Sequence, residues 1–195
     1  MSSAAAIAPE APERYHWTRQ AFHRAVDAGA FGGDDVLLRH GEVVRRVSPK
    51  GTRHAAALMR LNAATVVRLA RSGGAHLVRV QDPIARTDDD EPEPDLAIVV
   101  AGDYELDHPR PEEIVLVVEV ADSSFAIDRR KLAEYAEVGI PQAWIVDVVR
   151  RRVLVHRDPD PARGEYTDVA TFTQGTLSVA GIEVAVSEIF PAPRS

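Results

Sequence analysis

The stretch Ile114-Val115-Leu116-Val117-Val118-Glu119-Val120 decides the fold of this chain. All of its residues except Glu119 are aliphatic, and such a run predicts a strand buried on both faces near the centre of a sheet. An ionised glutamate at that position is costly without a partner. For a lone glutamate, solvation or a salt bridge at the carboxyl end of the strand is the simplest explanation. Ligands also bind at the carboxyl ends of strands, so a functional role for Glu119 stays open.

A helix and a second buried strand follow this run. The pattern predicts a helix over residues 128–138, which Asp128 can cap at its start and residues 139–141 (Gly-Ile-Pro) end. The apolar residues 143–146 then predict a buried strand. A strand, a helix and a strand in this order imply a parallel crossover connection.

Lys131 lies one turn into the predicted helix, where the crossover can bring it back over the strand end, within reach of Glu119. Tyr135 lies four residues further along the same helix face. Only Lys50 and Lys131 are lysines among 23 basic residues, so a lysine in this sequence suggests a need for a compact ammonium group. A solvated basic turn is the simpler explanation of residues 129–131 (Arg-Arg-Lys), but cations are unfavourable at a helix N-terminus unless they face an anion.

A second carboxylate precedes the neighbouring predicted strand. Asp95 follows Pro94 directly and opens the apolar run 96–100. Alone, it could simply be a turn aspartate. If the two strands are adjacent, Asp95 and Glu119 converge, and two such carboxylates either share a proton or hold a hard divalent cation. Mg²⁺ or Mn²⁺ is the expected ion.

The remaining sequence predicts more helices and strands around this centre and no second core. Helices are expected over residues 18–28 and 53–71, hairpin strands over 36–38 and 43–44, a strand over 76–80, antiparallel strands over 152–157 and 165–173 around a turn at 158–161, and a final turn or short helix over 186–190. We therefore expect one α/β (α+β) domain over residues 14–195, after a flexible tail over residues 1–13.

Composition and charge exclude several kinds of protein. The chain has 195 residues, which suits one domain, and no cysteine, which excludes disulfides, thiolate metal sites and cysteine nucleophiles. No stretch resembles a signal peptide or a membrane span, so a cytoplasmic protein with no membrane partner is expected. The net charge of -7 argues against indiscriminate binding to nucleic acid. The acidic residues 88–94 predict a stiff, solvated loop that would repel nucleic acid, so a substrate would approach from another side.

Other candidates for chemistry are weaker. The seven histidines show no zinc-binding spacing, and there is neither a phosphate-binding loop nor a Gly-x-Ser-x-Gly elbow. Residues 150–152 (Arg-Arg-Arg) and Arg157 could line a phosphate-binding surface, but exposed arginines are common at a hairpin turn, and they receive no catalytic role.

The spaced elements together resemble a known family. Their order is the one found in the Uma-type family of putative restriction endonucleases. The elements are Pro94-Asp95, a strand that ends in Glu119, and the series Asp128, Lys131, Tyr135, Gly139-Ile140-Pro141, Trp144 and Val146-Asp147. That family belongs to the PD-(D/E)XK nuclease superfamily. The resemblance runs from about Tyr15 to Phe190 and includes Gly41-Glu42, Ser48-Pro49 and His54.

The resemblance implies a restriction-endonuclease-like mixed β-sheet flanked by helices, with a metal-dependent active site. Asp95, Glu119 and Val120 are then the expected metal ligands, and Lys131 positions or activates the attacking water. Glu42 corresponds to an additional acidic residue that reaches the metal through water. The superfamily usually has a lysine two residues after the glutamate, where this chain has Ala121, so Lys131 must supply the positive charge.

Two functions of different classes follow from the resemblance. The first is an Mg²⁺- or Mn²⁺-dependent endonuclease that hydrolyses phosphodiester bonds of nucleic acid, with DNA the expected substrate and RNA the open alternative. The second is a catalytically silent nuclease-fold protein that serves as a binding or assembly module, for which the acidic charge is the main support. Cutting both strands of a duplex would suit a homodimer. His54 is expected at the surface or in a capping role rather than in catalysis.

Overall fold

The computed structural model of the protein describes residues 13–46, 51–122 and 125–190. In chain order its elements are α1 (Arg19–Asp27), β1 (Val36–Arg39), β2 (Glu42–Arg45), α2 (Thr52–Arg71), β3 (His76–Val80), β4 (Leu96–Val100), the 3-10 helix η1 (Pro111–Glu113), β5 (Ile114–Ala121), α3 (Phe125–Glu137), β6 (Gln142–Asp147), β7 (Arg152–Asp160), β8 (Glu165–Phe172), β9 (Thr176–Val179), β10 (Ile182–Ala185) and α4 (Val186–Ile189). The predicted tail over residues 1–13 lies outside the described residues, apart from Glu13. Among the helices that the structure describes, none has the length and apolar character to cross a membrane.

Six strands form one mixed sheet in the order β3-β4-β5-β6-β7-β8. β5 and β6 run parallel, and every other neighbouring pair in this sheet is antiparallel. β5 therefore lies inside the sheet between β4 and β6, as its aliphatic sequence predicts. The parallel pair is connected through α3, which confirms the expected crossover.

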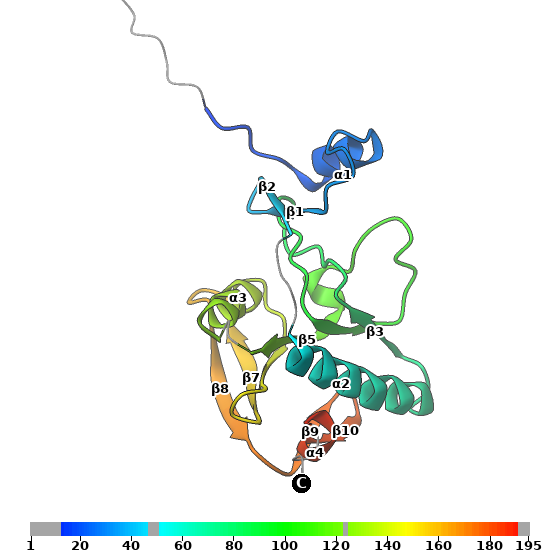
Figure 1. Ribbon diagram of the computed structural model, residues 1–195, viewed down its shortest axis with the longest axis vertical. Helices are drawn as coiled ribbons and strands as arrows, with labels where there is room; N and C mark the ends of the chain where they lie inside the picture. Colours follow the sequence, from blue (N-terminus) through cyan, green and yellow to red (C-terminus); the bar gives the residue numbers. More distant parts are fainter. Residues whose placement is uncertain (1–12, 47–50, 123–124, 191–195) are drawn as a thin grey trace, which may run out of the picture.

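Side chains of the central strands alternate between the two faces of the sheet. On one face, Leu116, Val118 and Trp144 join a core with α2, α4 and the β9–β10 hairpin. On the other face, Val117 and Ile145 pack in a second core with residues of α3. Figure 1 shows α2 beside α4 and β10, and α3 beside β7 and β8. The sheet thus lies between two outer layers, in agreement with the expected α/β class.

The helix after β5 begins earlier than the sequence predicts. α3 starts at Phe125, so Asp128 lies inside the helix and not at the N-cap position that the sequence predicts. Lys131 accordingly lies nearly two turns into α3 instead of one. Because side chains alternate along a strand, the side chain of Glu119 points to the same face of the sheet as that of Val117, and α3 covers this face. Lys131 and Tyr135 are four residues apart on one face of α3, and both face the glutamate.

The C-terminal region holds a hairpin that the sequence analysis missed. β9 and β10 pair antiparallel around Ala180 and Gly181, which both adopt positive φ, as a two-residue type I′ turn requires. The sequence does carry a signal for this hairpin, because apolar Leu177 and Val179 alternate with polar residues before the turn and apolar Ile182 follows it. The turn expected at 158–161 is also shifted, because β7 continues to Asp160.

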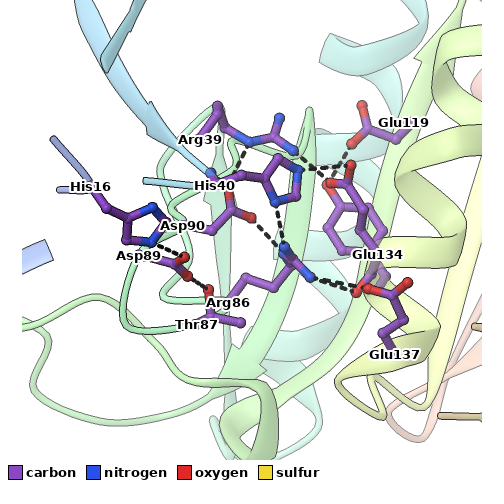
Figure 2. A network of polar contacts seen from close by, with 11 residues as sticks. His16, Arg39, His40, Arg86, Thr87, Asp89, Asp90, Glu119, Glu134 and Glu137 are labelled. Atoms are coloured by element: carbon purple, nitrogen blue, oxygen red, sulfur yellow. Dashed lines mark hydrogen bonds and ion pairs between the residues drawn. The ribbon is translucent and has the colours of Figure 1, made fainter. Parts of the chain in front are cut away.

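The acidic segment before β4 is not the solvated loop that its composition predicts. Asp90 is fully buried and Glu91 is 2% exposed. Asp90 accepts hydrogen bonds from Arg86 Nε at 2.5 Å and from Arg39 Nε at 2.8 Å, as Figure 2 shows. Burial alone would raise the pKa of Asp90, but the hydrogen bond from Arg86 and the charge of Arg39 outweigh it and lower the pKa. Arg86, which lies close to Asp90 in the sequence, and Arg39, which lies far from it, thus make the burial of this aspartate possible.

We expect Asp90→Asn to lower the free energy of unfolding by about 3 to 5 kcal/mol, because the buried guanidinium of Arg86 loses its counter-charge. Asp88→Asn, at an exposed position of the same segment, is the matched control and should change stability little. Urea denaturation of both variants and the wild type measures the difference. Equal stabilities for the two variants would contradict the assigned role of the buried ion pairs.

Candidate metal centre

Glu119 lies near the carboxyl end of β5 and is almost completely buried, with 2% of its surface exposed. Two side chains of α3 bind its carboxylate. The ammonium of Lys131 donates to Oε2 at 2.8 Å, and the hydroxyl of Tyr135 donates to Oε1 at 2.7 Å. The sequence predicted both side chains on one helix face near this glutamate, and the structure confirms that placement. Of the two simple explanations of Glu119, solvation is wrong, because the side chain is buried, and the salt bridge is present, with Lys131.

The surroundings of Glu119 favour its protonated form. Burial raises the pKa of Glu119 to about 7, and the positive charge of Lys131 opposes this rise only in part. The negative charge of Asp95 raises the pKa further. A carboxyl group in this environment gains from the approach of a cation, because a cation stabilises its ionised form.

Asp95 is brought to Glu119 by the antiparallel register of β4 and β5. Leu96 pairs with Val118 in this register, so the residue before β4 lies beside the end of β5. Asp95 Oδ2 accepts a hydrogen bond from the backbone N–H of Val120 at 2.8 Å. The convergence expected of Asp95 and Glu119 is therefore present, and Val120 contacts the same carboxylate through its main chain.

His54 is the site residue that sequence reasoning undervalued. It lies in the first turn of α2 and is 8% exposed, and its Nε2 lies 3.0 Å from Asp95 Oδ2. An ionised carboxylate only accepts hydrogen bonds, so the imidazole donates from Nε2. The expectation of a surface or capping role is wrong, since Gly51 is the N-cap of α2. The position of His54 at the start of the long helix was the available signal, but its contact depends on tertiary packing.

Glu42 lies apart from this cluster in its described contacts. It belongs to β2 of the N-terminal hairpin, and its carboxylate pairs with Arg14 at 2.9 Å. Its side chain is 60% exposed. The turn that precedes it has His40 and Gly41 at positive φ, which fits a type I′ hairpin. The role of Glu42 as a residue that reaches a metal through water stays a prediction.

The hairpin contacts the helix that carries Lys131 and Tyr135. Arg39 Nη2 donates to Glu134 Oε2 at 2.5 Å, and His40 Nε2 lies 3.3 Å from Glu134 Oε1. Figure 2 shows these side chains converging between the hairpin and α3. Glu134 precedes Tyr135 in α3, so the contact holds the helix segment that faces Glu119. The sequence analysis did not identify this connection.

The donor set at the end of β5 suits a hard divalent cation. Asp95 and Glu119 offer carboxylate oxygens, and Val120 can offer a main-chain carbonyl oxygen, which are the ligand types that Mg²⁺ and Mn²⁺ prefer. The residues present therefore fit the ion that the sequence predicts.

Comparison with known proteins agrees with this geometry. A model of the family Uma2, described as putative restriction endonuclease, matches residues 30–187. The chain belongs to the Uma2 family. Glu42, Asp95, Glu119 and Lys131 all lie within the matched residues. The resemblance described from the sequence is therefore confirmed for this Uma2 chain.

A solved structure shares the fold of this Uma2 chain. A crystal structure of a putative nuclease belonging to DUF820 from Anabaena variabilis superposes with a TM-score of 0.60 and covers 80% of this chain and 89% of that chain. The sequence identity is 13%, so the likeness shows the fold alone. No curated protein gives a significant match to the chain.

The raised pKa of Glu119 predicts a pH-dependent effect of Glu119→Gln. The folded state holds the proton up to about pH 7, whereas the ordinary pKa is 4.5, so wild-type stability falls as pH rises from about 4.5 to 7 and then stays level. The uncharged amide does not ionise, so the variant gains stability relative to wild type over this window, by roughly 3 kcal/mol at most. Thermal denaturation in EDTA at pH 5 and pH 8 measures the gain.

Glu112→Gln is the matched control, because Glu112 is exposed on η1. Its stability difference from wild type should be nearly the same at both pH values. A Glu119→Gln difference that is likewise independent of pH would show that burial does not raise the pKa of Glu119 in the folded protein.

Proposed function

We propose that this Uma2 protein is a divalent-metal-dependent nuclease that hydrolyses phosphodiester bonds of nucleic acid, with DNA as the expected substrate. The observation that carries the proposal is that Asp95 binds the main chain of Val120, the residue after the buried Glu119, and acts on the charge of Glu119, whose carboxylate is held by Lys131. Family membership and the shared fold support nuclease activity. A cytoplasmic location and a homodimer that cuts two strands belong to the same proposal.

The carboxylates of Asp95 and Glu119 and the main chain of Val120 are the groups that would hold Mg²⁺ or Mn²⁺. When bound, such an ion would acidify a water molecule and neutralise charge on the scissile phosphate. Asp95 is oriented for this task by hydrogen bonds from Val120 N–H and His54. These partners fix the carboxylate in place, as outer-shell contacts commonly do for metal ligands.

Lys131 is the cation proposed to act on the substrate. Its side chain is 23% exposed, so the ammonium lies at the border between the buried Glu119 and solvent. From that position it can steady the attacking water or the negative charge that develops on the phosphate. Arginine, which the sequence uses almost everywhere else, is larger and less able to exchange a proton.

Tyr135 is proposed as a positioning residue. Its side chain is fully buried, and its hydroxyl donates to Glu119 Oε1. Burial raises the pKa of Tyr135 well above its ordinary value, so the hydroxyl remains a hydrogen-bond donor. Tyr135 therefore orients the glutamate and takes no part in proton transfer.

The alternative, a silent binding or assembly module, drew its main support from the acidic charge. Part of that support is removed, because Asp90 and Glu91 are buried against arginines and do not present their charge to a nucleic acid. An intact pair of converging carboxylates costs stability unless it serves a ligand. The nuclease is therefore the function that the geometry supports best.

The test combines metal binding with cleavage. Wild type should bind Mg²⁺ or Mn²⁺ by calorimetry and cleave at least one substrate in a screen of duplex, single-stranded and structured nucleic acids. Asp95→Asn should lose both properties, because a metal ligand is removed. Lys131→Met should keep the metal but lower the cleavage rate by about 100-fold or more, as expected when a charge-stabilising group is lost.

Asp103→Asn, at an exposed position between β4 and η1, is the matched control and should behave as wild type. Wild type that binds no metal even with nucleic acid present would overturn the nuclease proposal and favour the binding module. Cleavage by Lys131→Met at the wild-type rate would overturn the role of the lysine alone.

A further inference from the structure

A second cluster of ligating side chains lies outside the proposed catalytic centre. His23 comes from α1, Glu91 from the segment before β4, and His108 from the connection between β4 and η1. His23 Nε2 lies 2.9 Å from Glu91 Oε1, and the rings of His23 and His108 are 5.7 Å apart. One ligand atom of each of the three residues lies within 4.8 Å of the others. Their separation in sequence explains why the histidine spacing gave no sign of them.

The cluster borders a hollow of about 260 Å³ that is lined in part by Phe22, Val36 and Leu38. Glu91 lines the hollow and is buried, whereas His23 and His108, which also line it, are each partly exposed. The three side chains can thus close on an ion from one side while the hollow leaves another side open. An arrangement of three protein ligands with one open position is typical of zinc sites that also bind water or another ligand.

Carboxylates and arginines both surround the cluster. Four carboxylates line the hollow, those of Asp34, Asp35, Glu91 and Glu93, together with one guanidinium, that of Arg46. A further arginine, Arg19, binds Glu91 Oε1 at 2.6 Å. Arg19 is shared with Asp107, so its positive charge is balanced by a second carboxylate. Asp34 also pairs with Arg45, and Arg46 pairs with both Asp35 and Glu93. Arginines thus balance much of this negative charge, and the case for a cation rests on the imidazole and carboxylate donors of the cluster.

We propose that His23, Glu91 and His108 form a second metal site, which binds a borderline cation such as Zn²⁺, Ni²⁺ or Co²⁺. Two imidazoles and one carboxylate suit these ions, whereas the all-oxygen set at Asp95 and Glu119 suits Mg²⁺ or Mn²⁺. The two sites thus differ in both position and metal preference.

A metal at this position would join three segments that are distant in sequence. α1 already contacts the acidic segment through the backbone hydrogen bond from Arg19 N–H to Asp88 O, and Glu91 N–H donates to Leu38 O of β1. The ion would add a link from α1 to both connections that flank β4. The ion would therefore fasten α1 to the segments on either side of β4, and its open position would remain available to water or another ligand.

The test uses the full chain, stripped of metal by EDTA and dialysed. Calorimetric titration with Zn²⁺, together with the visible absorption spectrum after addition of Co²⁺, reports on the imidazole ligands. Wild type should bind Zn²⁺ and gain thermal stability from it. His23→Ala and His108→Ala should each weaken binding by more than the roughly 10- to 100-fold that loss of an outer-shell partner costs, and should lose the thermal gain.

Two control variants make the result specific. His76→Ala removes a histidine of β3 and should bind Zn²⁺ as wild type does. Asp95→Asn should also keep Zn²⁺ binding, which separates this site from the proposed catalytic centre whether or not that centre is active. Wild type that binds none of the three cations, His23→Ala and His108→Ala that bind as tightly as wild type, or loss of binding in Asp95→Asn would each overturn the proposal.

Discussion

The burial of one carboxylate in the central strand governs the arrangement of this protein. Glu119 interrupts an aliphatic strand that needs both faces covered, and an ionised carboxylate there is stable only with partners. The crossover helix supplies such partners, an ammonium and a hydroxyl, whereas the carboxylate of Asp95, which precedes the antiparallel neighbour β4, opposes the ionisation of Glu119. The sheet order β4-β5-β6 and the return of α3 over β5 are what bring these groups together. A fold that satisfied packing alone would have placed an aliphatic side chain at this position.

Much of this arrangement could be predicted because it depends on local patterns. The aliphatic run of β5, the glycine and proline after α3, and the spacing of Lys131 and Tyr135 are all visible in the sequence. Strand alternation then fixes which face Glu119 uses. The start of α3 was less predictable, because Asp128 offered a cap that the longer helix does not use.

Features that depend on distant partners could not be predicted. Acidic composition suggests solvation for residues 88–94, yet arginines from α1 and β1 bind Glu91 and Asp90 and make burial of these acids favourable. His54 likewise gains its role only when α2 packs beside Asp95. The cluster of His23, Glu91 and His108 forms in the same way from three separate segments. Sequence spacing carries no information about such contacts until the chain is folded.

A layer of ion pairs connects the N-terminal segments to α3. Arg39 bridges Asp90 and Glu134, and Arg86 bridges Asp90 and Glu137, so one buried aspartate links the hairpin to α3 (Figure 2). Because guanidinium groups bind carboxylates with fixed geometry, this layer restrains the helix that presents Lys131 and Tyr135.

The most direct test of the central claim is anomalous diffraction from crystals soaked in Mn²⁺. The account predicts an anomalous peak between the carboxylates of Asp95 and Glu119, and crystals that bind Mn²⁺ elsewhere but show no peak there would contradict it.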